Sequence, residues 1–285
     1  MWNIINCLII YIFTKQKNKL KKKNNLYLKS VYWGGGTPTT LTHEQLDVIL
    51  TEIENDFDLS KCIEYTVEAG RPDTITKEKL DVLKKHNINR ISINPQTFNN
   101  SVLKEIGRCH SAEETVEKYN LARETGFDVI NMDLIAGLPT DTVEGFKNSV
   151  EKALSLNPEN ITVHTLSLKR SSTIVTEDEK DSLDASVTSD MVEYANLRLT
   201  ESGYKPYYMY RQKNTVGNLE NVGFSIEGHE GLYNVYMMEE FQTIFAVGAG
   251  AVTKLVKFDN GMNSDPKIMR LFRPKYPYEY LREAE

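Results

Sequence analysis

Cysteine is scarce in this sequence, and long apolar runs are absent. Only three cysteines, Cys7, Cys62 and Cys109, occur among 285 residues, and they are widely scattered. This excludes a disulfide framework and is typical of a reducing compartment, so we expect a cytoplasmic protein. The apolar run IINCLIIYIF near the start is shorter than the roughly 20 residues that a membrane helix needs.

Charge is also uneven along the chain. The formal net charge of −6 gives no indication of a nucleic acid or membrane partner. Residues 15–29, however, carry seven lysines and no acidic residue. These lysines follow the apolar run, whereas a secretory signal has its positive charge first. Residues 1–29 are therefore either a membrane anchor with a basic flank or, as we favour, a poorly ordered lead-in outside the folded core.

From residue 30 onward, strand-like and helix-like segments alternate. The expected strands are SVYW (30–33), CIEYTVEA (62–69), RISIN (90–94), DVINMDLIA (128–136) and NITVHTLSL (160–168). Amphipathic helix patterns occupy 42–55, 76–87, 111–126 and 141–157, the first with a capping box of Thr42 and Gln45. Repeated βα units with apolar strands predict a parallel sheet, either open and doubly wound or closed into a barrel.

Polar residues stand where these strands end. Strand one runs into Gly34, Gly35, Gly36 and Thr37; the later strands bring Glu68, Gln96, Asp133 and His164. Parallel α/β folds build their sites at this edge, so the residues predict a shared cleft. Alternatively, Glu68 forms a salt bridge with Arg71 and Asp133 caps the next turn.

The glycine loop itself indicates a ligand that meets bare backbone. Glu68 and Asp133 suit ribose hydroxyls or an amine, while Gln96 and Arg108 suit amide or carboxylate groups. A phosphate is disfavoured because no P-loop lysine follows and Pro38 removes a donor.

Six segments of the sequence belong together: YWGGGTPTTL, YTVEAGRPDTIT, RISINPQTF, IGRCHSAEET, GFDVINMDLIAGLPTDT and ITVHTLSLKR. Together they resemble the radical S-adenosylmethionine (SAM) family. Within it they resemble the oxygen-independent coproporphyrinogen III oxidases, also called coproporphyrinogen dehydrogenases, and in particular their HemZ-like branch. The resemblance covers about residues 30 to 255. It implies an α/β fold, a partial TIM-like (β/α)6 radical SAM barrel with a C-terminal α+β extension.

The resemblance also implies the site and its chemistry. The loop Gly34, Gly35, Gly36, Thr37 would meet the methionyl part of SAM, Glu68 would contact SAM, and Gln96, Arg108 and Asp133 would line the same cavity. A [4Fe–4S] cluster in the family cleaves SAM, and the resulting radical starts the oxidative decarboxylation of coproporphyrinogen III to protoporphyrinogen IX. A tetrapyrrole substrate and an electron donor are the implied partners; oligomeric state stays open.

One family feature is missing from this sequence. The cluster is normally held by C-x-x-x-C-x-x-C upstream of the glycine loop, and only Cys7 lies there. One thiolate cannot replace three, so no metal ligands are predicted and the chain alone is expected to be inactive. We interpret it as lacking the first barrel strand; the alternative is a cluster-free protein that binds heme or a porphyrin, like a chaperone.

The expected organisation is a lead-in at 1–29, a partial barrel at 30–170 and a C-terminal substrate-side region at 171–285. In that region we expect a helix at 186–204, a strand at 204–212 and close-approach loops at GNLENVGF and GAGA. The tyrosines at 207, 208 and 210 either stack on a tetrapyrrole or, more in keeping with strand residues, pack internally. Charge alone makes Arg211, Lys213 and Lys254 candidates for propionates.

Overall fold

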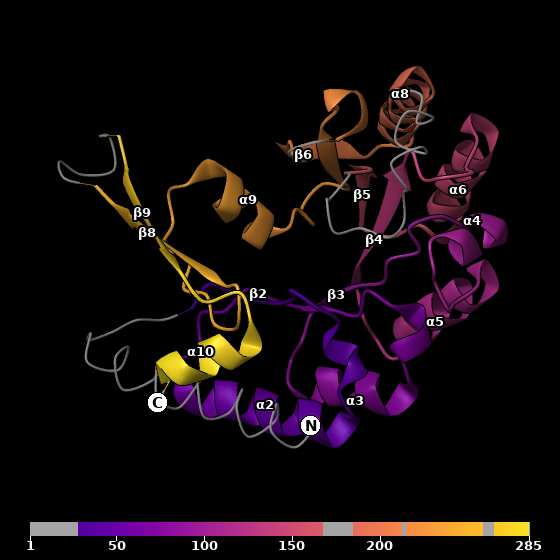
Figure 1. Ribbon diagram of the computed structural model, residues 1–285. Helices are drawn as coiled ribbons and strands as arrows, with labels where there is room; N and C mark the ends of the chain where they lie inside the picture. The colour runs from indigo at the N-terminus through magenta and orange to yellow at the C-terminus, as the bar shows by residue number, and fades with distance from the viewer. Residues whose placement is uncertain (1–27, 168–184, 213–214, 259–264, 285) are drawn as a thin grey trace. The chain divides into compact units, whose positions relative to one another are not determined.

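A computed structural model describes residues 28–167, 185–212, 215–258 and 265–284 (Figure 1). The chain divides into two compact units. We call residues 32–41 and 65–231 the sheet unit, because they hold nearly all of the main sheet. The second unit comprises residues 42–64 and 232–285 together with those up to 31. The predicted boundaries at 29 and 170 stay a prediction.

The five predicted strands are confirmed. They are β1 (Ser30–Trp33), β2 (Glu64–Glu68), β3 (Arg90–Ser92), β4 (Val129–Ala136) and β5 (Asn160–Thr165). Strands β2 to β5 pair in parallel, with Glu68 beside Ser92, Ser92 beside Asn131 and Asp133 beside Thr162. Carboxyl ends of successive strands therefore meet at one edge, as βα repetition requires.

Beyond β5 the sheet contains one strand that the sequence predicted, at 204–212, and one that it did not predict. Strands β6 (Lys205–Tyr210) and β7 (Asn221–Ser225) complete a sheet of order β1-β2-β3-β4-β5-β7-β6. Strand β7 lies antiparallel between β5 and β6, and all five of its residues are buried. The prediction of a loop at GNLENVGF is therefore wrong for its second half. The fold class holds: a curled half-barrel sheet of mixed α/β type.

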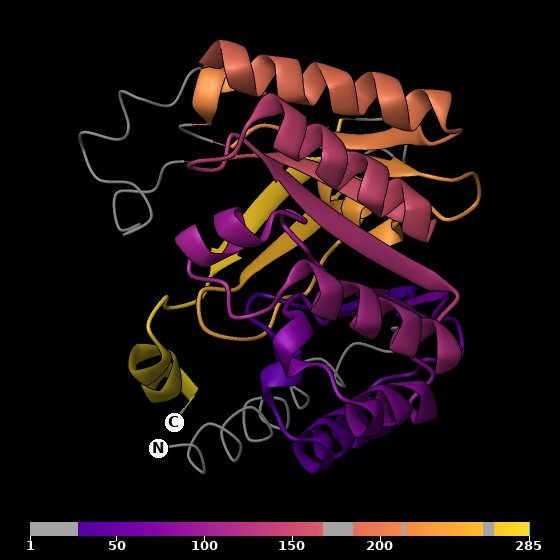
Figure 2. The same ribbon diagram turned by 90° about the vertical axis from the view of Figure 1, so that its right-hand side faces the viewer.

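In the sheet unit, one or two helices follow each of the strands β2 to β5 and lie on the outer side of the sheet (Figures 1 and 2). In the sheet unit they are α3 (Lys77–Lys85), α4 (Asn100–Glu105), α5 (Ala112–Glu124), α6 (Val143–Leu156) and α8 (Ala185–Glu201). Side chains of Thr76, Ser111 and Thr142 cap α3, α5 and α6 by accepting backbone N–H groups. Short connecting 3-10 helices η1 (Pro38–Thr40), η2 (Pro72–Thr74) and η3 (Val216–Asn218) join the elements.

Strand β4 shows how the two faces of the sheet differ. Ile130, Met132, Leu134 and Ala136 are fully buried on one face, whereas the alternate residues are only half-buried. A side-chain period of two assigns the half-buried positions, Asn131 and Asp133 among them, to the inner face of the curl. The inner face is thus where polar side chains stay accessible.

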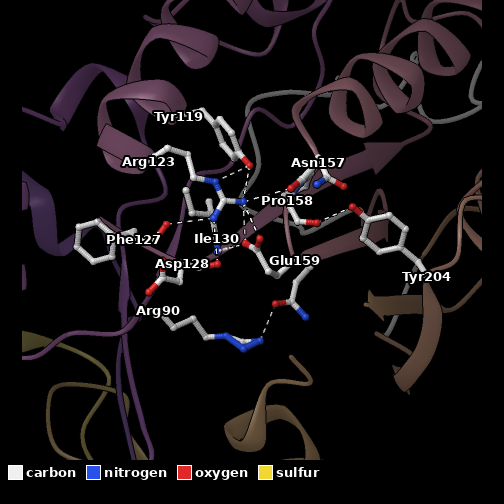
Figure 3. A network of polar contacts seen from close by, with 11 residues as sticks. Arg90, Tyr119, Arg123, Phe127, Asp128, Ile130, Asn157, Pro158, Glu159 and Tyr204 are labelled. Carbon is white, nitrogen blue, oxygen red and sulfur yellow. Dashed lines mark hydrogen bonds and ion pairs between the residues drawn. The ribbon is translucent and has the colours of Figure 1, made fainter. Parts of the chain in front are cut away.

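The amino ends of β4 and β5 are joined by a polar network around Arg123 (Figure 3). The Arg123 guanidinium donates to both Glu159 oxygens at 2.8 Å and to the hydroxyl of Tyr119. Glu159 in turn accepts the backbone N–H of Ile130 at 2.9 Å, so it holds the start of β4. Nearby, the Tyr204 hydroxyl donates to the carbonyl of Pro158. Each polar group here has a protein partner, which is typical of a stabilising device.

The second unit contains α2 (His43–Asp56), α9 (Leu232–Glu239), the hairpin β8 (Val252–Lys257) and β9 (Lys267–Phe272), and α10 (Pro277–Ala284). The predicted capping box at Thr42 and Gln45 is confirmed. Helix α9 is held at both ends, since Glu64 accepts the N–H groups of Leu232 and Tyr233 and Lys254 donates to two carbonyls of its last turn. None of the helices in the described segments combines the length and apolar character that a bilayer span needs.

Candidate functional site

The glycine loop after β1 lies directly against Glu68 at the end of β2. A Cβ atom on Gly34 would come within 2.5 Å of the Glu68 carboxyl carbon and 2.6 Å of the Tyr32 ring. A Cβ atom at this distance would force the Glu68 carboxyl group or the Tyr32 ring to move, so the observed arrangement depends on glycine at this position. The N–H of Gly35 donates to Glu68 at 3.3 Å, and the Tyr32 hydroxyl donates to the same carboxylate. The sequence-predicted contact between loop and strand end is present.

Glu68 lies in an environment that disfavours its charged form. Burial raises the pKa of the Glu68 carboxyl, and the negative charge of Asp133 raises it further, against the opposing hydrogen bond from Tyr32. Repulsion between two carboxylates at a partly buried sheet edge raises the free energy of the protein without ligand. Such a pair is suited to a ligand that brings positive charge or several hydroxyl donors.

Asp133 is the centre of a hydrogen-bonded row on the inner face. Its carboxylate accepts the Asn131 amide at 2.8 Å and lies 3.5 Å from Nε2 of His164. Burial acts to raise the pKa of Asp133, but His164, with Asn131 and Thr162, outweighs it and the pKa lies below its usual value. The lowered pKa favours the ionised form of Asp133, and its negative charge is the one that acts on Glu68.

Neither of the structural alternatives for these two acids is observed. Arg71 pairs with Asp73 at 3.1 Å, and Asp133 bonds within the sheet, through Asn131, instead of capping the turn after β4. The two acids of the predicted cleft are thus brought together, as the parallel register requires.

Two tyrosines of β6 extend the row. The hydroxyl of Tyr208 lies 3.3 Å from that of Thr162, and the hydroxyl of Tyr210 lies 3.3 Å from Nδ1 of His164. The rings of Tyr208 and Tyr210 are parallel, with centroids 6.2 Å apart. Tyr208 crosses β7 at Gly223, where any Cβ atom would overlap its ring. Glycine in this strand therefore makes room for an aromatic side chain.

Gln96 is joined to Asp133 through the backbone. Its N–H donates to the Asp133 carbonyl at 3.0 Å and its carbonyl accepts from Ile135 at 2.9 Å. The residue has a φ of 66°, a left-handed conformation that non-glycine residues rarely adopt. The paired backbone holds Gln96 in this conformation at the rim beside Asp133.

Arg108 belongs to a neighbouring group. Burial and the charge of Arg71 lower its pKa, and Asp73 is its nearby acid. His110, fully buried, follows it and contacts the carbonyl of Pro95. In the described part of the chain no hydrogen bond or ion pair joins Arg108 to Glu68 or Asp133. The role of all these residues in binding SAM stays a prediction.

Two of the three basic residues proposed for propionates have protein partners. Arg211 pairs with Glu220 at 2.9 Å at the surface. Lys254 is buried and donates at 3.0 Å to the carbonyls of Tyr236 and Met237, in the last turn of α9. Its ammonium group therefore already has acceptors within the protein. The charge-based expectation for Lys254 is therefore wrong. Lys213 lies outside the described residues.

The residues present fit SAM but not an iron–sulfur cluster. A loop without Cβ atoms beside two carboxylates matches a ligand with ribose hydroxyls, an amine and a sulfonium. Cys62, before β2, and Cys109, after Arg108, are single free thiols, and Cys7 lies outside the described residues. Within those residues no group of three potential ligands is placed to hold a metal ion. Three thiolates for a cluster are not supplied by the arrangement seen here.

The sequence interpretation missed the middle of the row. Ser92, Asn131 and Thr162 link neighbouring strands through bonds of 2.8 and 3.2 Å. Ser92 is the last residue of β3, whereas Asn131 and Thr162 lie before the ends of their strands. The signal was the alternation in β4, where Asn131 and Asp133 interrupt an apolar strand at every second position. In a sheet covered on both faces those positions are apolar, so polar residues there indicate an open inner face.

Comparisons with known proteins identify the family of the chain. Residues 15–153 match the sequence profile of the Radical SAM superfamily. The oxygen-independent coproporphyrinogen-III oxidase-like protein HemZ of Bacillus subtilis is 48% identical over 266 residues, which cover 93% of this chain and 52% of that protein. The heme chaperone HemW of Lactococcus lactis is 33% identical over 227 residues, 79% of this chain and 56% of that protein.

A solved structure shares the fold. The coproporphyrinogen III oxidase HemN of Escherichia coli, described as a radical SAM enzyme, superposes with a TM-score of 0.73 at 21% identity, over 97% of this chain and 60% of that one. The chain thus spans about half the length of the curated relatives it matches. The glycine loop, the half-barrel sheet and these matches together show that the chain belongs to the radical SAM superfamily, in its HemN- and HemZ-like group.

Proposed function

We propose that this chain is the SAM-binding part of a radical SAM protein that acts on a tetrapyrrole. The observation that carries the proposal is the close approach of the Gly34 backbone to Glu68, with Asp133 near enough to raise the pKa of Glu68. An exposed loop backbone and two carboxylates at one rim form a receptor for a cationic nucleoside. A positively charged ligand would reduce the repulsion between the two carboxylates, and this reduction favours binding.

Each group has a distinct part in this proposal. The backbone of the glycine loop would bind the methionyl amine and carboxylate, which need donors and acceptors but little space. Glu68 and Asp133 would accept hydrogen bonds from ribose hydroxyls and attract the sulfonium. Gln96, fixed in its left-handed conformation, would present its amide to the same ligand.

For the whole protein we propose oxidative decarboxylation of coproporphyrinogen III to protoporphyrinogen IX in heme biosynthesis. Its support is the 48% identity to a coproporphyrinogen-III oxidase-like protein. Cys62 and Cys109, the cysteines in the described residues, do not form a cluster site, so no step of that reaction is assigned to this chain. What we propose for the chain itself is ligand binding.

Calorimetric titration with SAM tests the proposal without any cluster. We expect saturable binding by the wild type and about tenfold weaker binding by Asp133→Asn, which removes one of the paired charges. Asp128→Asn is the matched control, because Asp128 is exposed just before the amino end of the same strand. Absence of saturable binding by the folded wild-type protein, or equal losses in both variants, would contradict the proposal.

The second candidate is a cluster-free protein that binds heme. It is favoured by the relatives named heme chaperones and by the parallel rings of Tyr208 and Tyr210 on the inner face. A spectral titration distinguishes it: a saturable Soret shift that Tyr210→Ala weakens would support heme binding. A chain that binds SAM but shows no such shift would remove this candidate.

A further inference from the structure

The loops after β1 and β2 are built to the same plan. The first, PTTLT at 38–42, and the second, PDTIT at 72–76, share the pattern proline, any residue, threonine, an apolar residue, threonine. Each forms a single 3-10 turn, η1 or η2, with proline at its start. In each turn a threonine hydroxyl bonds back to the carbonyl three residues earlier, at 2.8 Å for Thr40 and 2.7 Å for Thr74.

The two turns are bonded directly to each other. The hydroxyls of Thr39 and Thr74 lie 2.6 Å apart, and Thr39 is fully buried. Because η1 follows Thr37 without a break, this contact fixes the far end of the glycine loop. Its near end is already fixed by the contacts of Gly34 and Gly35 with Glu68.

One cation completes the junction between the turns. The Lys79 ammonium donates to the carbonyl of Thr39 at 2.6 Å and to the carbonyl of Thr74 at 2.9 Å. Thr74 is the last residue of η2 and Thr39 is the middle residue of η1. Carbonyls this close to the end of a short helix have no further helical N–H to accept. Lys79 therefore supplies one donor group to both turns.

This lysine stands where a helix does not favour it. Lys79 occupies the third position of α3, close to the positive end of the helix dipole, and its N–H bonds to the capping Thr76. The same position in α2 holds Gln45, which completes a capping box. Burial lowers the pKa of Lys79, a second cost of placing a charge here. The bonds to the two turns are the compensating interaction that the structure shows.

We propose that Lys79 is a positioning residue that holds the glycine loop in its ligand-ready conformation. The inference rests on the proposed SAM site. A loop that is tied at both ends loses little conformational entropy when the ligand binds, so affinity is higher than for a loose loop. Lys79 has no contact with the ligand in this scheme; it acts through Thr39.

The test compares Lys79→Met with Lys77→Met. The first keeps the aliphatic stem and removes the ammonium; the second removes an exposed lysine on the same helix that pairs only with Asp81 one turn later. We expect Lys79→Met to bind SAM about tenfold more weakly and Lys77→Met to match the wild type. Lys79→Arg keeps donors at this position and should recover most of the affinity.

Amide hydrogen exchange without ligand provides the second readout. Lys79→Met should speed exchange across residues 34–41 several-fold and leave residues 129–136 unchanged. If Lys79→Met matches the wild type in affinity and in exchange, the inference is overturned. If the wild type does not bind SAM at all, the proposed function fails, while the exchange data still decide whether Lys79 fixes the loop. Should Lys79→Met not fold, Thr74→Val removes the neighbouring hydroxyl bond and gives the same comparison.

Discussion

The amino ends and the carboxyl edge of the same sheet use charged side chains in opposite ways. At the amino ends Arg123 and Glu159 neutralise each other and bind nearby backbone groups, so nothing is left for a ligand (Figure 3). At the carboxyl edge Glu68 and Asp133 have the same sign and raise each other's energy. The first arrangement stabilises the fold, whereas the second stores a cost that a ligand can remove.

The largest effect is expected at the amino ends. Glu159→Ala leaves the Arg123 guanidinium and the Ile130 N–H without their carboxylate, and we expect a loss of about 3 kcal/mol in the free energy of unfolding. Glu151→Ala breaks the exposed pair with Arg198 and should cost less than about 1 kcal/mol. Urea denaturation measures both. Similar losses of unfolding free energy in the two variants would show that the network of Arg123 and Glu159 stabilises the fold no more than the exposed pair of Glu151 and Arg198 does.

A smaller effect is expected at the glycine loop. Gly34→Ala places a methyl group against Glu68 and Tyr32, so we expect about 2 kcal/mol of destabilisation and a loss of SAM affinity of about thirtyfold. Gly36→Ala is the control for stability, because a Cβ atom there meets nothing within 4 Å. Thermal melts and calorimetry give the two quantities. A Gly34→Ala protein as stable as Gly36→Ala would show that the close approach is not real in solution.

The smallest effect has the opposite sign for stability. The folded-state pKa of Glu68 is raised, so its contribution is fully present below the unfolded pKa of about 4.3 and is lost as pH rises through the folded value. Glu68→Gln should therefore be about 1 kcal/mol more stable than the wild type at pH 7 and no more stable at pH 4. Urea midpoints at the two pH values test this. Equal differences at both would mean that charge repulsion at Glu68 is absent.

Local signals in the sequence were sufficient for most elements. Six strands and five helices were predicted, β6 and α8 among them, and the predicted capping box of Thr42 and Gln45 is present. Strand β7 was missed because Asn221 and Gly223 are typical of loops. The reason for glycine there is the ring of Tyr208 on the adjacent strand, a contact that only the folded sheet reveals.

The candidate site was predictable only in part. Glu68 and Asp133 follow from the rule that parallel strands bring their carboxyl ends to one edge. Lys254 shows the limit of reasoning from charge. Its partners are two backbone carbonyls of α9, and no pattern in the sequence around Lys254 indicates that they lie beside it. Lys79 was not singled out at all, since a lysine in a helix reads as solvated surface until its two acceptors are seen.

The crossing of Tyr208 over Gly223 makes the residue allowed at position 223 depend on the residue at position 208. A Cβ atom at 223 would overlap the ring of Tyr208, so a larger residue there requires a smaller side chain at 208. Position 208, in contrast, can become smaller while Gly223 stays. The order of substitutions on this face of the half-barrel is therefore fixed: the tyrosine has to be replaced before, or together with, the glycine.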